Sequence, residues 1–66
     1  MNIYLVNGHV NRTEYGGEDQ SFDEIRLVKA NNPREAELKY EAYWEAQTDL
    51  YSVYYHARGN VLETIE

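Results

Sequence analysis

The 66-residue sequence contains no cysteine, a single proline and no long apolar run. Without cysteine it can form no disulfide, and thiolate catalysis and thiolate-bound zinc are excluded. No apolar run approaches the ~20 residues that a membrane span needs. The N-terminus also lacks the basic start and apolar stretch of a signal peptide. We therefore expect a cytoplasmic protein.

Basic residues are also scarce, with six Lys and Arg against twelve Asp and Glu, for a net charge of -6. Binding to a phosphate backbone depends on clustered Lys and Arg, so direct nucleic-acid binding is disfavoured. A basic protein partner is favoured instead, through electrostatic steering and complementarity.

The length predicts one domain over residues 1–66 with a thin core, because chains of this size bury only about 60% of their unfolded surface. Seven tyrosines, one phenylalanine and one tryptophan are available to fill that core. Aromatic rings bury a large area per residue. A second copy of the chain is the other source of stability that we consider.

Catalytic and cofactor motifs are missing from the sequence. The two histidines, His9 and His56, have no second metal ligand at helical or alternate-residue spacing. Gly16-Gly17 lies among carboxylates and lacks the Gly-Lys-Ser/Thr ending of a phosphate loop. We therefore expect no enzymatic activity, no metal and no cofactor.

The N-terminal half has the pattern of two strands. We predict one strand over 2–13 with Gly8 as a bulge, followed by a loop over 15–20. A tight hairpin turn at Asn7-Gly8 is the alternative. The stretch "FDEIRLVKA" alternates in the manner of a strand with one wet face, with Ile25 and Leu27 on the same side.

A helix is predicted from Pro33 to Gln47, because Asn32 is a good N-cap, Pro33 suits the first helical position and Glu35 suits a capping box. "LYSVYYHA" then predicts a strand, "RGN" a turn and "VLETIE" a short edge strand. The expected fold is α+β, a small antiparallel sheet of three to four strands with one helix on one face, in ββαβ or ββαββ order.

The helical period assigns one aromatic stripe to the core. Ala36, Tyr40, Tyr43 and Gln47 fall within about 60° of one another, and Trp44 flanks them. We expect this stripe to pack against apolar residues of one sheet face, namely Ile3, Leu5, Ile25, Leu27, Val53 and Tyr55.

Two groups of acidic residues are candidate partner-binding sites. The first is a ridge of outward-facing helix glutamates with one apolar neighbour: Glu37, Glu41, Glu45 and Leu38. The second gathers around the predicted loop: Glu14, Glu18, Asp19, Asp23 and Glu24. Like charges four residues apart weaken a helix by a few tenths of a kcal/mol per pair, a cost that favours a functional ridge. The alternative is a solvated face that keeps the domain soluble.

The sheet face away from the helix is a second candidate interface. We expect it to carry Tyr4, Val6, Val28, Tyr54 and His56. A mixed apolar face of this kind suits dimerisation or partner binding, with Tyr54 as the anchor. The alternative is a scattered, partly wet face.

The succession "MNIYLVNG", an acidic loop, "VKANNPREAELKYEAYWE" and a tyrosine-rich strand resembles small phage-encoded proteins of the anti-CRISPR and anti-defence type. The likeness lies in size, charge and the order of strand and helix over the whole chain. It implies a stoichiometric inhibitor in the host cytoplasm that covers a basic nucleic-acid-binding surface of a defence complex, with nucleic-acid mimicry as one mode. The alternatives are a structural or assembly adaptor that dimerises through its open sheet face and a small-ligand (nucleotide) binder that uses stacked tyrosines.

Overall fold

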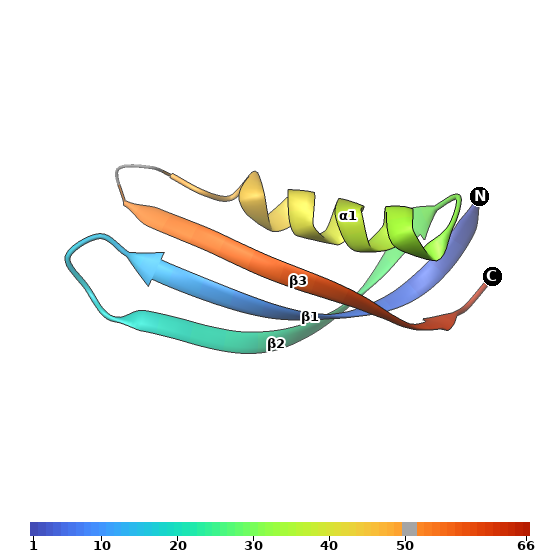
Figure 1. Cartoon of the computed structure of the whole chain (residues 1–66), viewed down its shortest axis with the longest axis horizontal. Helices are drawn as coiled ribbons and strands as arrows, with labels where there is room; N and C mark the ends of the chain where they lie inside the picture. The colour runs from blue at the N-terminus through green and yellow to red at the C-terminus, as the bar shows by residue number, and fades with distance from the viewer. Residues whose placement is uncertain (50–51) are drawn as a thin grey trace.

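A computed structural model describes residues 1–49 and 52–66 as a three-stranded antiparallel sheet with one helix packed against it (Figure 1). The elements follow in the order β1 (Asn2–Glu14), β2 (Asp19–Ala30), α1 (Pro33–Glu45) and β3 (Val53–Thr64). The sheet order is β2-β1-β3, so β1 is the central strand. This arrangement confirms the α+β prediction in its ββαβ form. Among the described residues, no helix combines the length and the apolar character needed to cross a membrane.

The molecule is elongated, with extents of 42 × 17 × 13 Å. Both termini lie at one end, and the loop between β1 and β2 lies at the other (Figure 1). Helix α1 begins near the terminal end and covers one face of the sheet. The segment after α1 runs on towards the loop end, where β3 begins.

The central strand is continuous, as predicted, and the alternative of a tight hairpin at Asn7-Gly8 is wrong. Gly8 pairs regularly with Glu24 of β2 and Gly59 of β3, so the predicted bulge is also wrong. The one shift in register lies between Leu5 and Val6, in the pairing with β3.

The last strand is also longer than expected. Residues 58–60 pair with β1 in register, as Arg58 with His9, Gly59 with Gly8 and Asn60 with Asn7. The predicted turn at "RGN" is therefore wrong, because a straight strand here lets Gly59 lie beside Gly8. The predicted strand start at Leu50 and Tyr51 falls outside the described residues.

The helix start was predicted correctly. The backbone N–H of Glu35 donates to Asn32 Oδ1 at 2.8 Å, and Pro33 occupies the first turn. The Glu35 carboxylate accepts from the backbone N–H of Asn31 at 3.3 Å, which lowers the pKa of Glu35. The helix ends at Glu45, two residues before the predicted Gln47.

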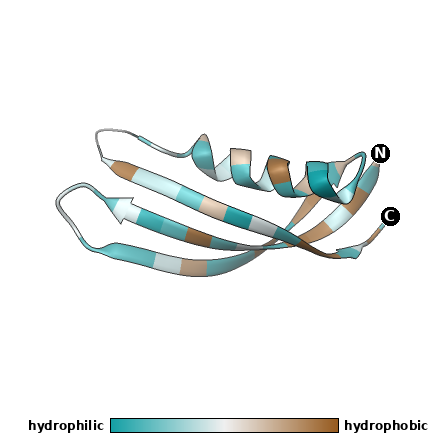
Figure 2. Cartoon of the chain, viewed as in Figure 1, coloured by the Kyte–Doolittle hydropathy of each residue, from teal (hydrophilic) through white to brown (hydrophobic). Residues whose placement is uncertain are grey.

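The buried core lies between α1 and the helix-facing side of the sheet. It consists of Tyr4, Val6, Val10, Ala30, Ala36, Tyr40 and Ala57. Apolar and polar residues alternate along the strands (Figure 2). The helix covers the side of β1 and β2 opposite to the predicted one, so Ile25 and Leu27 remain 58% and 61% exposed.

Because the helix covers the other side of β1 and β2, the prediction of an open face with Tyr4, Val6 and Val28 is wrong. Tyr4 and Val6 are buried, and Val28 packs against the core at half-burial. Of the five residues assigned to that face, Tyr54 and His56 are exposed. The strand alternation itself was right, but it did not say which of its two faces the helix covers.

Tyr40 explains the choice of face. Its ring lies over Gly8 and Gly59, which are paired across β1 and β3. A Cβ built on Gly8 would overlap the Tyr40 ring atoms. The Tyr40 hydroxyl donates to the backbone oxygen of Glu24 at 3.2 Å, and burial raises its pKa.

The other helix aromatics are less buried than Tyr40. Tyr43, predicted to be in the core, is 41% exposed, and the Arg26 guanidinium lies 4.1 Å from its ring centroid. Trp44 is half-buried and contacts the rings of Phe22 and Tyr55. The core prediction is therefore confirmed for Tyr40 and wrong for Tyr43.

Replacement of Gly8 by alanine is expected to destabilise the protein strongly, because the new methyl group would overlap the Tyr40 ring. Overpacking of this kind costs about 1–3 kcal/mol. Thermal unfolding followed by circular dichroism measures the loss. Gly59→Ala is the matched control: its Cβ would lie 3.2 Å from Tyr40 Cδ1, so a smaller loss is expected. Equal stability of Gly8→Ala and wild type would contradict the Tyr40 contact.

Replacement of Asn32 by alanine removes the side-chain acceptor for the N–H of Glu35. We expect a loss of about 1 kcal/mol in the free energy of unfolding, the usual cost of an N-cap. Asn31→Ala, one residue earlier, keeps the Asn32 cap and is the control. A melting temperature unchanged in Asn32→Ala would show that the cap contributes nothing.

Candidate functional site

The predicted acidic ridge of α1 does not face outward. Glu41 Oε2 accepts from the backbone N–H of Gly59 at 3.2 Å, and Glu37 Oε2 accepts from the N–H of Val61 at 3.3 Å. Both donors belong to β3, which lies at one edge of the sheet formed by the described strands and pairs there with β1. Two of the three ridge glutamates therefore bind the protein's own sheet edge.

Thr48, which follows α1, binds a third backbone N–H of β3. The backbone N–H of Tyr55 donates to Thr48 Oγ1 at 3.0 Å. An uncovered sheet edge presents backbone groups that can pair with another chain. We name Glu37, Glu41 and Thr48 the edge cover, because together they occupy N–H groups along the outer side of β3. At Glu37 and Glu41, the ridge carboxylates therefore serve to hold the edge of the sheet.

The two remaining ridge residues are accessible. Glu45 is exposed at the last position of α1, and Leu38 is 47% exposed. Neither takes part in the edge cover. The ridge therefore does not supply a continuous acidic surface.

The second acidic group separates into paired and open carboxylates. Glu14 contacts Arg12 at 3.3 Å, and Glu24 contacts Arg26 at 2.9 Å. Asp23 Oδ1 lies 2.8 Å from His9 Nδ1. Arg12 and Arg26 each lie two residues from their carboxylate along the same strand, whereas the pairing of β1 with β2 brings His9 to Asp23. Glu18 and Asp19 are exposed at the loop between β1 and β2.

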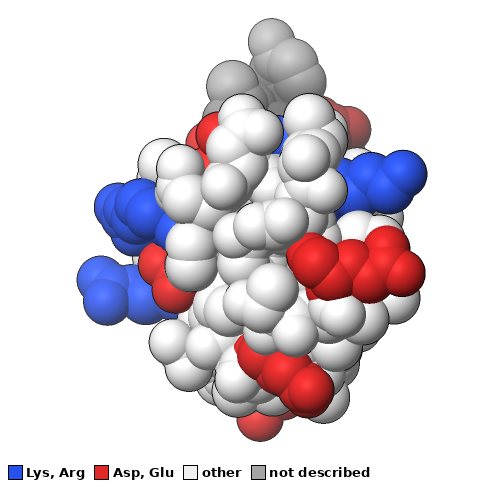
Figure 3. Space-filling view, turned by 90° about the vertical axis from the view of Figure 1, so that its right-hand side faces the viewer, with Lys and Arg blue, Asp and Glu red and all other residues white. Residues whose placement is uncertain are grey.

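Negative charge is nevertheless concentrated at the loop end of the molecule. We define the loop end as residues 12–19 together with 48, 49 and 52–54, which hold four carboxylates and one guanidinium. Its formal charge of -3 is half of the net -6 in far fewer than half of the residues. At the opposite end, some acidic side chains lie near Lys and Arg, whereas those in the lower part of the view do not (Figure 3).

Two tyrosines are exposed at the loop end. Tyr15 is 86% exposed and Tyr54 is 52% exposed. The backbone N–H of Tyr15 donates to the backbone oxygen of Ser52 at 2.8 Å, which holds the β1–β2 loop against the start of β3. Tyr15 was not among the predicted site residues, although its place in the predicted loop over 15–20 indicated an exposed ring.

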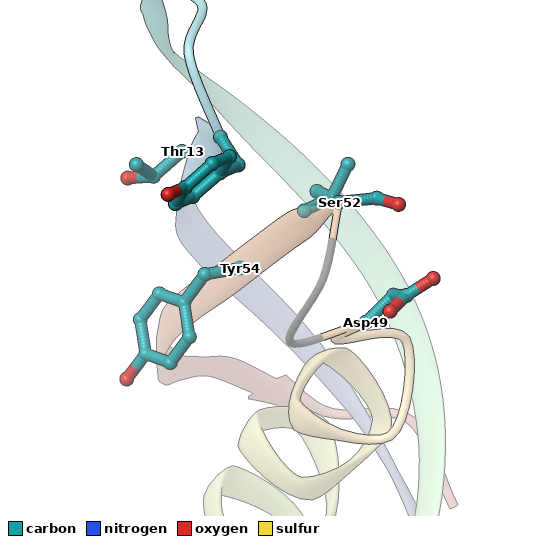
Figure 4. A pocket seen from close by; sticks show the side chains of 6 residues that line it. Thr13, Asp49, Ser52 and Tyr54 are labelled. Atoms are coloured by element: carbon teal, nitrogen blue, oxygen red, sulfur yellow. The ribbon is translucent and has the colours of Figure 1, made fainter.

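A pocket of about 190 Å³ lies where these segments meet (Figure 4). Its lining residues are Thr13, Tyr15, Asp49, Ser52, Val53 and Tyr54. A second, more polar pocket of about 400 Å³ lies beside the outer edge of β3, next to Glu41 and His56. Within the described parts of the chain, no group of three or more His, Cys, Asp or Glu is placed to hold a metal ion.

The chain matches no protein-family model, no curated protein and no solved structure. Function is therefore inferred from the chemistry of the surfaces described above. The best-defined candidate is the loop end, where acidic residues and exposed tyrosines lie together.

Removal of the Glu41 carboxylate tests the edge cover. We expect Glu41→Ala to destabilise the protein by about 1–3 kcal/mol, because the Gly59 N–H loses a charged acceptor in a half-buried place. Glu45→Ala makes the same chemical change one turn later on the exposed helix end and is expected to be nearly neutral. Urea unfolding of both variants measures the difference. Equal stability of the two variants would mean that Glu41 does not hold the edge.

Proposed function

We propose that the protein is a non-enzymatic inhibitor that uses its loop end to bind a basic, nucleic-acid-binding surface of another protein. The supporting observation is the concentration of half the net charge around two exposed tyrosines. Tyrosine is enriched at the energetic centres of protein interfaces. Surrounding carboxylates steer a basic partner towards them and select against acidic ones.

The loop end is a better contact than the helix for a physical reason. Glu37 and Glu41 are engaged with β3, so moving them to a partner would uncover backbone N–H groups. Glu18 lies in the loop and Asp19 is the first residue of β2. Both side chains are exposed, so a change of side-chain partner there leaves the backbone pairing of the strands in place. Binding through them leaves the fold intact.

We favour binding of the basic partner by general electrostatic attraction over binding by close mimicry of nucleic acid. Duplex DNA carries one charge per ~1.7 Å of its axis. The loop end offers four carboxylates, one of them paired with Arg12. This density is too low to imitate a phosphate backbone, but it suffices to compete for part of a basic groove.

The proposed setting follows from the resemblance described above. An acidic single domain of this kind would act in the cytoplasm of a phage-infected cell, where it would block a defence complex that binds nucleic acid. The partner is then a protein surface rich in Lys and Arg.

The loop-end pocket favours a second candidate function. A cavity of about 190 Å³ beside Tyr15 and Tyr54 could hold a flat ligand such as a nucleobase against an aromatic ring. A rise in melting temperature with added nucleotide would support this alternative over the inhibitor.

The double variant Glu18→Lys/Asp19→Lys tests the inhibitor proposal. Immobilised wild-type protein is expected to retain, from a host lysate, proteins that duplex DNA displaces and that mass spectrometry identifies. The variant places like charges against the basic surface, a juxtaposition that costs several kcal/mol. We expect its affinity for the retained protein to fall at least tenfold, and wild-type affinity to fall as salt rises.

The matched control is Glu63→Lys/Glu66→Lys, which changes the net charge equally at the terminal end, where both residues are exposed. It is expected to bind nearly as well as wild type. Equal weakening in both variants would show that net charge alone matters. The proposal would be refuted if duplex DNA did not displace the retained protein, or if the Glu18→Lys/Asp19→Lys variant bound it as tightly as wild type.

A further inference from the structure

The two edges of the sheet differ in how their outward backbone groups are hydrogen-bonded. The outer edge of β3 is occupied by the edge cover, whereas β2 forms the opposite edge. We infer that the β2 edge pairs, antiparallel, with β2 of a second copy of this chain and forms a dimer with a continuous six-stranded sheet. This dimer surface is separate from the loop-end contact proposed above.

The pairing pattern shows which β2 groups face outward. On β3, the outward N–H groups are those of Tyr55, Gly59 and Val61. Their β1 partners therefore direct their own hydrogen bonds to β2, because antiparallel residues alternate between bonded and non-bonded pairs. Arg26 and Glu24 oppose two of these β1 residues.

It follows that the outward backbone groups of β2 belong to the residues that alternate with these two, namely Asp23, Ile25 and Leu27. Among the described contacts of this edge, the Lys29 oxygen accepts from Lys39 Nζ at 2.9 Å. A carbonyl oxygen has two lone pairs, so this bond leaves room for a second donor.

Two large apolar side chains are exposed on this edge strand. Ile25 and Leu27 are 58% and 61% exposed, on the sheet face that the helix leaves bare. Natural proteins protect open edges with charge, proline or covering segments, and an open apolar edge is a pairing site. A second β2 strand would place an apolar neighbour beside each of these side chains on the same sheet face.

Charge and hydrophobicity together select one register. With the two-fold axis at Arg26, Ile25 lies opposite Leu27 of the second copy, and Asp23 lies opposite Lys29 of the second copy. Each of these pairs occurs twice, and opposite charges or apolar groups across strands are stabilising. Moving the axis to Ile25 would instead place Leu27 opposite an aspartate. The first register matches every one of these side chains with a compatible one.

The same register brings the two Arg26 residues together at the axis on the helix side. Each Arg26 is held within its own subunit, by Glu24 at 2.9 and 3.1 Å and by the Tyr43 ring. The paired carboxylate neutralises each guanidinium. Like-charge repulsion across the axis is thereby reduced.

The resulting dimer has both helices on one face and its two loop ends pointing in opposite directions. Residue 19 lies seven residues from the axis, or about 23 Å at the rise of a strand. The two acidic loop ends are then roughly 50 Å apart. Each remains open to a separate partner.

Sedimentation equilibrium tests the inference. Wild type is expected to sediment at twice the 7.8 kDa chain mass in the micromolar range. Asp23→Lys places lysine against lysine and should weaken the dimer at least tenfold, whereas Asp23→Lys/Lys29→Asp should restore it. The control is Asp19→Lys, which changes the net charge by the same amount as Asp23→Lys but lies outside the central pairs. This variant should remain dimeric.

A second variant tests the backbone pairing itself. Ile25→Pro removes an N–H that β1 does not use, and proline is tolerated at sheet edges. We expect a folded monomer by circular dichroism and sedimentation. A wild-type monomer up to millimolar concentration, or a folded Ile25→Pro variant that still dimerises, would overturn the inference. Failure of the Asp23/Lys29 exchange to restore the dimer would overturn the register.

Discussion

The contact between Tyr40 and the paired glycines Gly8 and Gly59 is the constraint on which the rest of the structure depends. Neighbouring strands supply a strip without side chains, and the ring fills it. This places α1 close to the sheet and fixes which face becomes the core. It also explains why β1 and β3 run straight through glycines that otherwise favour a bulge or a turn.

The position of α1 then determines what its glutamates do. Because the helix lies close to β3, Glu37 and Glu41 reach backbone N–H groups of that strand's outer edge. Their four-residue spacing corresponds to about 6 Å of helix rise, close to the span of two strand residues, about 6.6 Å. One helix face can therefore serve successive outward N–H groups. An acidic repeat that suggests a binding surface is here part of the sheet.

Local signals in the sequence were sufficient for the element order, the Asn32 cap and the long first strand, because each depends on neighbouring residues. The choice of sheet face was not predictable by counting apolar residues. Both faces carry aliphatic side chains, Ile25 and Leu27 on one and Val6 and Val10 on the other, but the face beneath the helix also has the two glycines over which Tyr40 fits. The edge cover depends on which strand lies at the edge, which is a property of topology. Glu18 in the loop and Asp19 at the first position of β2 are both exposed.

The misassigned face has a physical consequence. One short helix cannot cover both edges of a sheet, and α1 lies towards β3. The edge of β2 therefore stays open, and Ile25 and Leu27 are exposed beside it on the sheet face away from the helix. Pairing with a second copy would give each of them an apolar neighbour without altering the monomer. Two side chains that sequence reasoning assigned to the interior of one chain would then pack against each other across the boundary between two.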